Sequence, residues 1–162
     1  IFKILKIGEK LIKLSKAKPA DIKAMQTLVA PQVEAGIILP RSDDEVAQNI
    51  RSYILAKSGE QIIGFGALHI IAPDLAEVRS LIVAPSEQKS GIGAKIVNEL
   101  IAEARELGLT RVIALTYAQG FFEKLGFKLI EKNQIPSQKI WSDCVKCKHF
   151  PICDEKALML WL

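Results

Sequence analysis

The chain carries two kinds of hydrophobic pattern, which predict helices and strands in alternation. Residues 91–107 are expected to form a long helix ending at Gly108, because their apolar side chains recur at helical spacing. Shorter runs rich in β-branched residues predict strands at 11–17, 53–57, 61–71, 75–84, 111–117, 127–132 and 157–162. The apolar face of the long helix consists of Ile92, Ile96, Val97, Leu100, Ile101 and Ala104.

Capping and turn residues place the remaining elements. Asp21 is expected to open a helix over 21–29, and Ser42 with Glu45 has the spacing of a capping box at the start of a second helix. A short helix is expected over 119–125, and Ser58-Gly59 is expected to turn a hairpin. The chain shows no repeat or linker. It therefore predicts one α/β domain with a mixed α+β sheet over 11–162, preceded by an N-terminal extension at 1–10.

The first fourteen residues are basic and amphipathic. Lys3, Lys6, Lys10 and Lys13 recur at helical spacing with Ile and Leu between them. One interpretation is a helix that binds a membrane surface or a partner. The other is an extension that packs on the domain or on a second copy, which leaves a homodimer open. We favour the second interpretation, because Gly8 weakens any continuous helix.

Composition narrows the class of protein. The 162 residues are 49% hydrophobic and 25% charged, as in ordinary globular proteins, and they contain no apolar run long enough to span a bilayer. A net charge of +4 favours an anionic small molecule. Nucleic acid is not expected, since the basic residues are dispersed and only 6% of the residues are aromatic.

All three cysteines lie within ten residues, which is unlike a secreted disulfide framework. A reducing compartment is therefore expected, and we assign the protein to the cytoplasm. Three thiolates and one imidazole suffice for a structural zinc ion, with Asp154 as an alternative ligand to the imidazole. Reduced thiols without metal are the other interpretation. The candidate zinc ligands are Cys144, Cys147, His149 and Cys153.

A glycine-rich loop joins the strand at 75–84 to the long helix. Gln88, Gly91 and Gly93 form the pattern Q-x-x-G-x-G. The first turn of a helix exposes backbone N–H groups, and glycines let an anion approach them closely, so the pattern predicts a pyrophosphate cradle. A Rossmann site would need glycine where the chain has Ile96, and the Gly-Lys-Ser/Thr of a P-loop is missing from the helix start.

This loop resembles the coenzyme A loop of the GCN5-related N-acetyltransferase (GNAT) superfamily. The motif F-F-E-K-L-G-F at 121–127 supports the resemblance. Further segments resemble the short bacterial N-acetylglutamate synthases, and the likeness extends over about residues 12–162. These segments are I-L-P-R-S at 38–42, G-A-L-H at 66–69, L-A-E-V-R-S-L-I-V-A-P at 75–85, L-T-Y at 115–117 and K-I-W-S-D-C-V-K-C at 139–147.

The resemblance implies a GNAT fold, with a mostly antiparallel sheet of six or seven strands and about four helices. It also implies acetyl transfer from acetyl-coenzyme A to the α-amine of L-glutamate, the first step of arginine biosynthesis. The backbone of Ile82 and Val83 would pair with the pantetheine amides, and the short helix with Phe122 would pack along the pantetheine arm. The loop residues expected at the cofactor are Gln88, Lys89, Ser90, Gly91, Ile92 and Gly93.

Acetyl transfer needs a base, because an ammonium group cannot attack a thioester. The resemblance implies Glu77, which strand alternation would place on one face with Arg79, Leu81 and Val83. The alternative is a strand-end carboxylate paired with Arg79. A backbone N–H near Val83 is expected to meet the negative charge that develops on the thioester oxygen.

The leaving thiolate can be protonated by the protein or depart unaided. Many GNAT enzymes use a tyrosine in the short helix as the acid, but this chain has Phe122 there. Thr116 or Tyr117 is the candidate replacement. A thiol with a pKa of about 8.5 is also a fair leaving group without help.

A dicarboxylate acceptor needs cations, and Arg41, Arg79 and Lys139 are the candidates. Two alternatives to glutamate acetylation stay open. One is a GNAT enzyme that acts on another small amine or a protein N-terminus. The other is a coenzyme A-binding sensor without catalysis.

Overall fold

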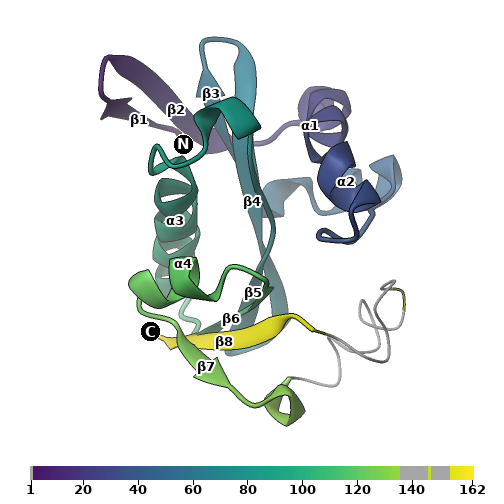
Figure 1. Cartoon of the computed structure of the whole chain (residues 1–162), viewed down its shortest axis with the longest axis vertical. Coiled ribbons are helices and arrows are strands. Elements are labelled where there is room, and N and C mark those ends of the chain that lie inside the picture. Colours follow the sequence, from purple (N-terminus) through teal and green to yellow (C-terminus); the bar gives the residue numbers. More distant parts are fainter. Residues whose placement is uncertain (1, 136–145, 147–153) are drawn as a thin grey trace.

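The computed structural model describes residues 2–135, 146 and 154–162. Over these residues the chain forms one eight-stranded sheet in the order β1-β2-β3-β4-β5-β6-β8-β7 (Figure 1). Every neighbouring pair is antiparallel except β5 and β6, which are parallel. The strands are β1 Phe2–Ile7, β2 Lys10–Lys16, β3 Tyr53–Ser58, β4 Gln61–Ala72, β5 Leu75–Val83, β6 Arg111–Thr116, β7 Lys128–Ile130 and β8 Lys156–Trp161.

In the described part of the chain, four α-helices flank this sheet: α1 Ile22–Glu34, α2 Asp43–Gln48, α3 Ile92–Glu106 and α4 Gln119–Lys124. Figure 1 shows α3 and α4 on one side of the sheet and α1 and α2 on the other. The predicted apolar face of α3 is confirmed, since all six of its residues are buried in the cluster beneath that helix. Burying each large apolar side chain contributes roughly 1.5–3 kcal/mol, so this face holds α3 on the sheet.

Two glycines in β4 let neighbouring elements approach closely. A Cβ atom on Gly64 would lie 2.9 Å from the carbonyl oxygen of Ile82, and one on Gly66 would lie 3.1 Å from Cγ2 of Ile96. These distances are shorter than ordinary packing contacts, so larger residues would push β5 or α3 outward. The glycines therefore help to set the position of α3 relative to β5.

The parallel strands β5 and β6 are hydrogen-bonded over only part of their length. The pairing runs from Leu75 opposite Arg111 to Glu77 opposite Ile113, and both strands then continue beyond the last pair. The gap between them is the place where a molecule can reach strand backbone that no neighbouring strand covers.

A β-bulge interrupts β5 just beyond this point. Ala67 of β4 pairs with Arg79, but Phe65 pairs with Ile82, so β5 has one residue more than β4 between these pairs. Ser80 lies in the bulge with φ of +57°, a left-handed conformation that is unusual outside glycine.

The bulge reverses the side-chain phase of β5, so the predicted common face is wrong. Ala76 and Val78 pack beneath α3, which leaves Glu77 and Arg79 on the opposite face. Beyond the bulge, Leu81 and Val83 pack on the α3 side, whereas Ile82 packs on the α1–α2 side. Glu77 and Arg79 therefore do not share a face with Leu81 and Val83.

The N-terminal stretch forms a β-hairpin, so the helical interpretation is wrong. Gly8 takes φ of +60° and turns the chain back, and β1 pairs with β2 from Phe2–Ser15 to Ile7–Lys10. Leu5 and Ile7 pack against the core cluster beneath α3. The hairpin also explains why the sheet has eight strands rather than six or seven.

The other elements follow the sequence pattern closely. The capping box of Ser42 is confirmed, with the N–H of Glu45 donating to its Oγ at 3.1 Å. Helix α1 runs further than predicted, through Pro31 to Glu34. None of the helices in the described ranges is long and apolar enough to cross a membrane.

Candidate active site

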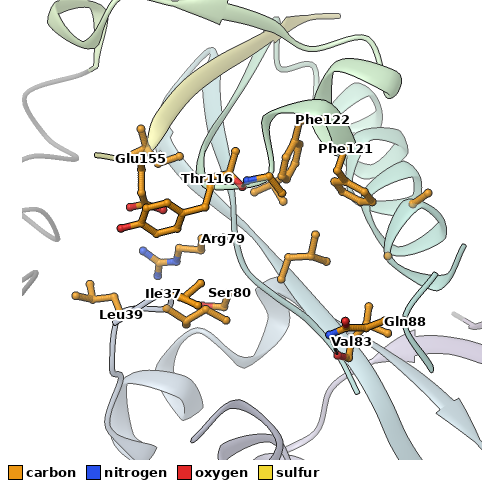
Figure 2. Close-up of a pocket in the computed structure, with 18 of the residues that line it drawn as sticks. Ile37, Leu39, Arg79, Ser80, Val83, Gln88, Thr116, Phe121, Phe122 and Glu155 are labelled. Carbon is orange, nitrogen blue, oxygen red and sulfur yellow. Dashed lines mark hydrogen bonds between the residues drawn. The ribbon is translucent and has the colours of Figure 1, made fainter. Parts of the chain in front are cut away.

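A cavity of about 1030 Å³ opens where β5 and β6 diverge. Its walls come from β5, the loop at 36–41, the start of α3 and the segment from Leu115 to Lys124. Figure 2 places Val83 and Gln88 at one end of the cavity, and Ile37, Leu39, Arg79 and Glu155 at the other. The two ends have different chemistry.

The first end is built for an anion. Gly91 caps α3 with φ of +89° and without a side-chain hydrogen bond, and the first helical bond runs from the N–H of Lys95 to the carbonyl of Gly91. The preceding N–H groups, on Ile92, Gly93 and Ala94, therefore have no acceptor within the helix, and all three residues line the cavity. A Cβ on Gly93 would lie 3.4 Å from the Phe121 ring, an ordinary van der Waals contact, so the start of α3 lies directly beside that ring.

Hydrogen bonds fix the loop before α3. The side chain of Gln88 donates from Nε2 to the carbonyl of Val83 at 3.2 Å, so it fastens the loop to the end of β5. The hydroxyl of Ser90 donates to the carbonyl of Glu87. Lys89 has φ of +65°, and the left-handed residues Lys89 and Gly91 curve the backbone around the cavity. The loop is thus preformed.

The second end holds Glu77 and two arginines. Glu77 is only 2% exposed and lies at the last pair between β5 and β6. Arg79 follows it on β5, and the side chain of Arg41 is 10% exposed, with Nη1 3.9 Å from Oε2 of Glu45. The side chain of Gln26 donates to the carbonyl of Arg41 at 2.8 Å, which ties the loop at 36–41 to α1. The carboxylates of Glu77 and Glu155 and the guanidinium groups of Arg41 and Arg79 therefore line the same end of the cavity.

The candidate proton donors occupy the turn between β6 and α4. The N–H of Ala118 donates to Oγ1 of Thr116 at 2.8 Å. Tyr117 is 43% exposed, and its hydroxyl donates to Oδ1 of Asp154 at 2.7 Å. Phe122 is 4% exposed and packs edge-on against Phe121 and Phe127, so it forms part of the apolar wall.

Most of the predicted site residues meet at this cavity. Its lining includes Glu77, Thr116 and Tyr117, the substrate candidates Arg41 and Arg79, and the cofactor candidates Val83, Gln88, Lys89, Gly91, Ile92, Gly93 and Phe122. The side chains of two cofactor candidates are engaged elsewhere. Ile82 is buried on the α1–α2 side, and Ser90 is bonded to the carbonyl of Glu87.

Five predicted residues lie outside the part of the chain that the structure describes: Lys139, Cys144, Cys147, His149 and Cys153. The zinc site and the role of Lys139 therefore stay predictions. Among the described residues, no group of three or more His, Cys, Asp or Glu side chains is arranged to hold a metal ion.

Several residues that line the cavity are not among those predicted from the sequence. Glu155 enters it from the segment before β8, and only the placement of β8 beside β6 brings it there. Ile37 and Leu39 come from the loop before Arg41, where their apolar run next to a proline was the available signal. Phe121 is the neighbour of the predicted Phe122.

Known acetyltransferases are similar in sequence to this chain. The acetyltransferase (GNAT) family model matches residues 23–127. An uncharacterized N-acetyltransferase of Chlorobaculum tepidum is 37% identical over 143 residues, covering 88% of this chain and 92% of that protein. The amino-acid acetyltransferase of Mycobacterium tuberculosis is 32% identical over 127 residues, covering 76% of this chain and 72% of that protein.

Solved structures are similar as well. A Mycobacterium tuberculosis protein in complex with CoA superposes with a TM-score of 0.80 at 26% identity, covering 92% of this chain and 98% of that chain. The N-acetylglutamate synthase of Neisseria gonorrhoeae, in complex with coenzyme A and N-acetylglutamate, gives a TM-score of 0.82 at 25% identity. That match covers 93% of this chain and 35% of the synthase, so the chain spans about a third of that protein.

Proposed function

Because this chain is an acetyltransferase of the GNAT family, we propose that it moves an acetyl group from acetyl-coenzyme A to the α-amine of L-glutamate. The observation that carries the proposal is one cavity with an anion cradle at one end and Glu77, Arg41 and Arg79 at the other. Such a reaction would serve as the first step of arginine biosynthesis in the cytoplasm.

Two arginines at the end of the cavity that holds Glu77, which we call the acceptor end, favour an acidic amino acid. L-glutamate has two carboxylates, and an arginine can grip each of them through two parallel hydrogen bonds. Arg41 and Arg79 line this end from different elements, the loop before α2 and strand β5. A site for polyamines would instead be rich in carboxylates. The N-acetylglutamate bound to the Neisseria gonorrhoeae synthase supports the same acceptor.

The residues at the other end suit coenzyme A. The N–H groups of Ile92, Gly93 and Ala94 would hold its pyrophosphate, and the apolar wall of Val83, Phe121 and Phe122 would flank its pantetheine arm. Bound in this way, acetyl-coenzyme A supplies an acetyl group activated as a thioester. The Phe121 ring lies beside Gly93 in this wall, where a Cβ on Gly93 would contact it at 3.4 Å.

Glu77 is the residue we assign to the proton on the acceptor amine. Its burial excludes bulk water, so a proton from the ammonium group has this carboxylate as its acceptor, directly or through one bound water. A backbone N–H near Val83 would stabilise the negative charge on the acetyl oxygen. Tyr117 already donates its hydroxyl to Asp154, so we favour Thr116 for any proton delivered to the departing sulfur.

The test is coenzyme A release with acetyl-coenzyme A and a panel of amines: L-glutamate, L-glutamine, L-aspartate, L-lysine and spermidine. We expect saturable turnover led by L-glutamate, and loss of that turnover in Arg41→Ala. The matched control is Arg51→Ala, which removes the same side chain from the short turn before β3, away from the cavity lining.

The other outcomes separate the remaining hypotheses. Turnover on spermidine or lysine alone would keep the acetyltransferase and refute the acidic acceptor. Coenzyme A binding without acetylation of any amine would favour a sensor.

A further inference from the structure

The N-terminal hairpin reaches the loop that precedes α3. Nζ of Lys10, at the start of β2, lies 2.5 Å from Oε1 of Glu87, in the short turn Pro85–Glu87. Figure 1 shows the β1–β2 hairpin beside this loop. A residue from the first strands of the chain therefore contacts the wall of the cavity.

The hairpin that carries Lys10 is packed onto the domain. Ile12 and Leu14 are buried beneath α3, and Leu5 and Ile7 pack against the same cluster. The hairpin is also joined to α3 by two ion pairs, Lys3 to Glu99 at 3.4 Å and Lys16 to Glu103 at 2.6 Å. The side chain of Lys10 is 55% exposed, so the packed strand fixes the backbone position from which its ammonium group reaches Glu87.

Backbone hydrogen bonds hold Glu87 in place. Its N–H donates to the carbonyl of Ala84 at 2.8 Å, and its own carbonyl accepts from the hydroxyl of Ser90. Its side chain is only 14% exposed, and the residue lines the cavity beside Gln88 and Lys89. A carboxylate is thus held next to the cradle that is built to receive an anion.

The carboxylate of Glu87 lies where it would repel an anionic ligand. A negative side chain beside an anion site repels the ligand, and the repulsion is stronger for a partly buried group than for an exposed one. We propose that Lys10 is a charge-compensating and positioning residue of the coenzyme A site: its ammonium neutralises Glu87 and adds positive charge at the rim of the phosphate cradle. The inference rests on the proposed use of coenzyme A and assigns the N-terminal hairpin a role in that site.

The test is a double-mutant cycle read by isothermal titration calorimetry of coenzyme A at low salt. Lys10→Gln should weaken binding about three- to tenfold, because Glu87 is left without its counter-charge. Glu87→Gln should bind coenzyme A more tightly than wild type, because the ammonium of Lys10 is no longer neutralised. The double variant Lys10→Gln/Glu87→Gln should return to within about twofold of wild type, since the repelling carboxylate is gone as well.

Three controls test whether the effect depends on the position and the charge of Lys10 and on the phosphates of the ligand. Lys6→Gln removes the same charge from the exposed strand β1, and it should change affinity less than about twofold. Lys10→Arg keeps the charge and should bind like wild type. Pantetheine, which has no phosphates, should bind wild type and Lys10→Gln equally.

Equal affinities for Lys6→Gln and Lys10→Gln, or no recovery in the double variant, would overturn the assignment of Lys10 while leaving the proposed function standing. Failure of the wild-type protein to bind coenzyme A at all would refute both. Thermal unfolding of each variant shows whether the hairpin has stayed in place. If Lys10→Gln does not fold, Glu87→Gln still tests the proposal: it leaves the ammonium of Lys10 without a neutralising carboxylate, so coenzyme A should bind more tightly than to wild type, and equal or weaker binding contradicts the proposal.

Discussion

Replacing Gly64 by alanine tests the close approach of β4 to β5, on which the geometry of the cavity depends. The new Cβ would lie 2.9 Å from the carbonyl oxygen of Ile82 and 3.3 Å from Cδ1 of Ile96. The first neighbour is backbone, so no rotamer change can relieve the contact, and the two strands must separate. Overpacking of this kind costs about 1–3 kcal/mol.

Alanine substitutions at Gly66 and Gly120 serve as comparisons for Gly64→Ala. A Cβ on Gly66 would meet only side-chain atoms, at 3.1 Å and beyond, so Gly66→Ala should cost less than Gly64→Ala. A Cβ on Gly120, in α4, would meet nothing within 4 Å. Gly120→Ala should therefore stabilise the protein by roughly 0.5–1 kcal/mol through higher helix propensity.

Urea unfolding followed by circular dichroism measures all three changes in the free energy of unfolding. The account predicts the order Gly64→Ala, Gly66→Ala, Gly120→Ala, from most to least destabilising, with the opposite sign for the last. Gly64→Ala should also weaken coenzyme A binding, because β5 carries the bulge and the end of the strand beside the cradle. A Gly64→Ala variant as stable as Gly120→Ala would refute the reasoning about strand spacing.

Three further predictions concern the chemistry. Glu77→Gln should lower kcat about 10²- to 10⁴-fold and leave coenzyme A affinity within about twofold by calorimetry; a near-normal kcat would exclude Glu77 as the base. Arg41→Lys should raise the KM for L-glutamate roughly tenfold without changing that for acetyl-coenzyme A, because lysine loses the bidentate grip; the reverse split would move Arg41 to the cofactor end. Tyr117→Phe should lower kcat less than about threefold, since the hydroxyl is bonded to Asp154, and a tenfold loss would make it the proton donor.

Local patterns in the sequence were sufficient for the elements that bury one continuous face. Helix α3 was predicted to within a residue at each end, because its apolar face, its opening glycines and Gly108 all act locally. The same holds for the capping box at Ser42. The candidate coenzyme A loop stands out in the sequence because its glycines and its helix start are adjacent.

Features that depend on pairing between distant segments were not predicted. The bulge at Ser80 exists because β5 must match the register of β4, and its residues give no local sign of a positive φ. Because of this bulge, Leu81 and Val83 lie on the α3 side of the sheet and not, as simple alternation along the strand predicts, on the face of Glu77. Glu155 reaches the cavity only because β8 inserts beside β6. The lysine spacing at the N-terminus is compatible with a helix, but the positive φ of Gly8 turns the chain back and β1 pairs with β2.

The most direct test of the central claim is the ratio of kcat/KM for L-glutamate to that for L-glutamine, measured by coenzyme A release at saturating acetyl-coenzyme A. The two acceptors differ by one charge at nearly constant shape, so the ratio isolates recognition of the side-chain carboxylate by the arginines of the acceptor end. The account predicts a preference of at least about tenfold for L-glutamate, which falls toward one in Arg41→Ala. Equal values for the two acceptors, or a preference for L-glutamine, would contradict the assignment of an acidic acceptor.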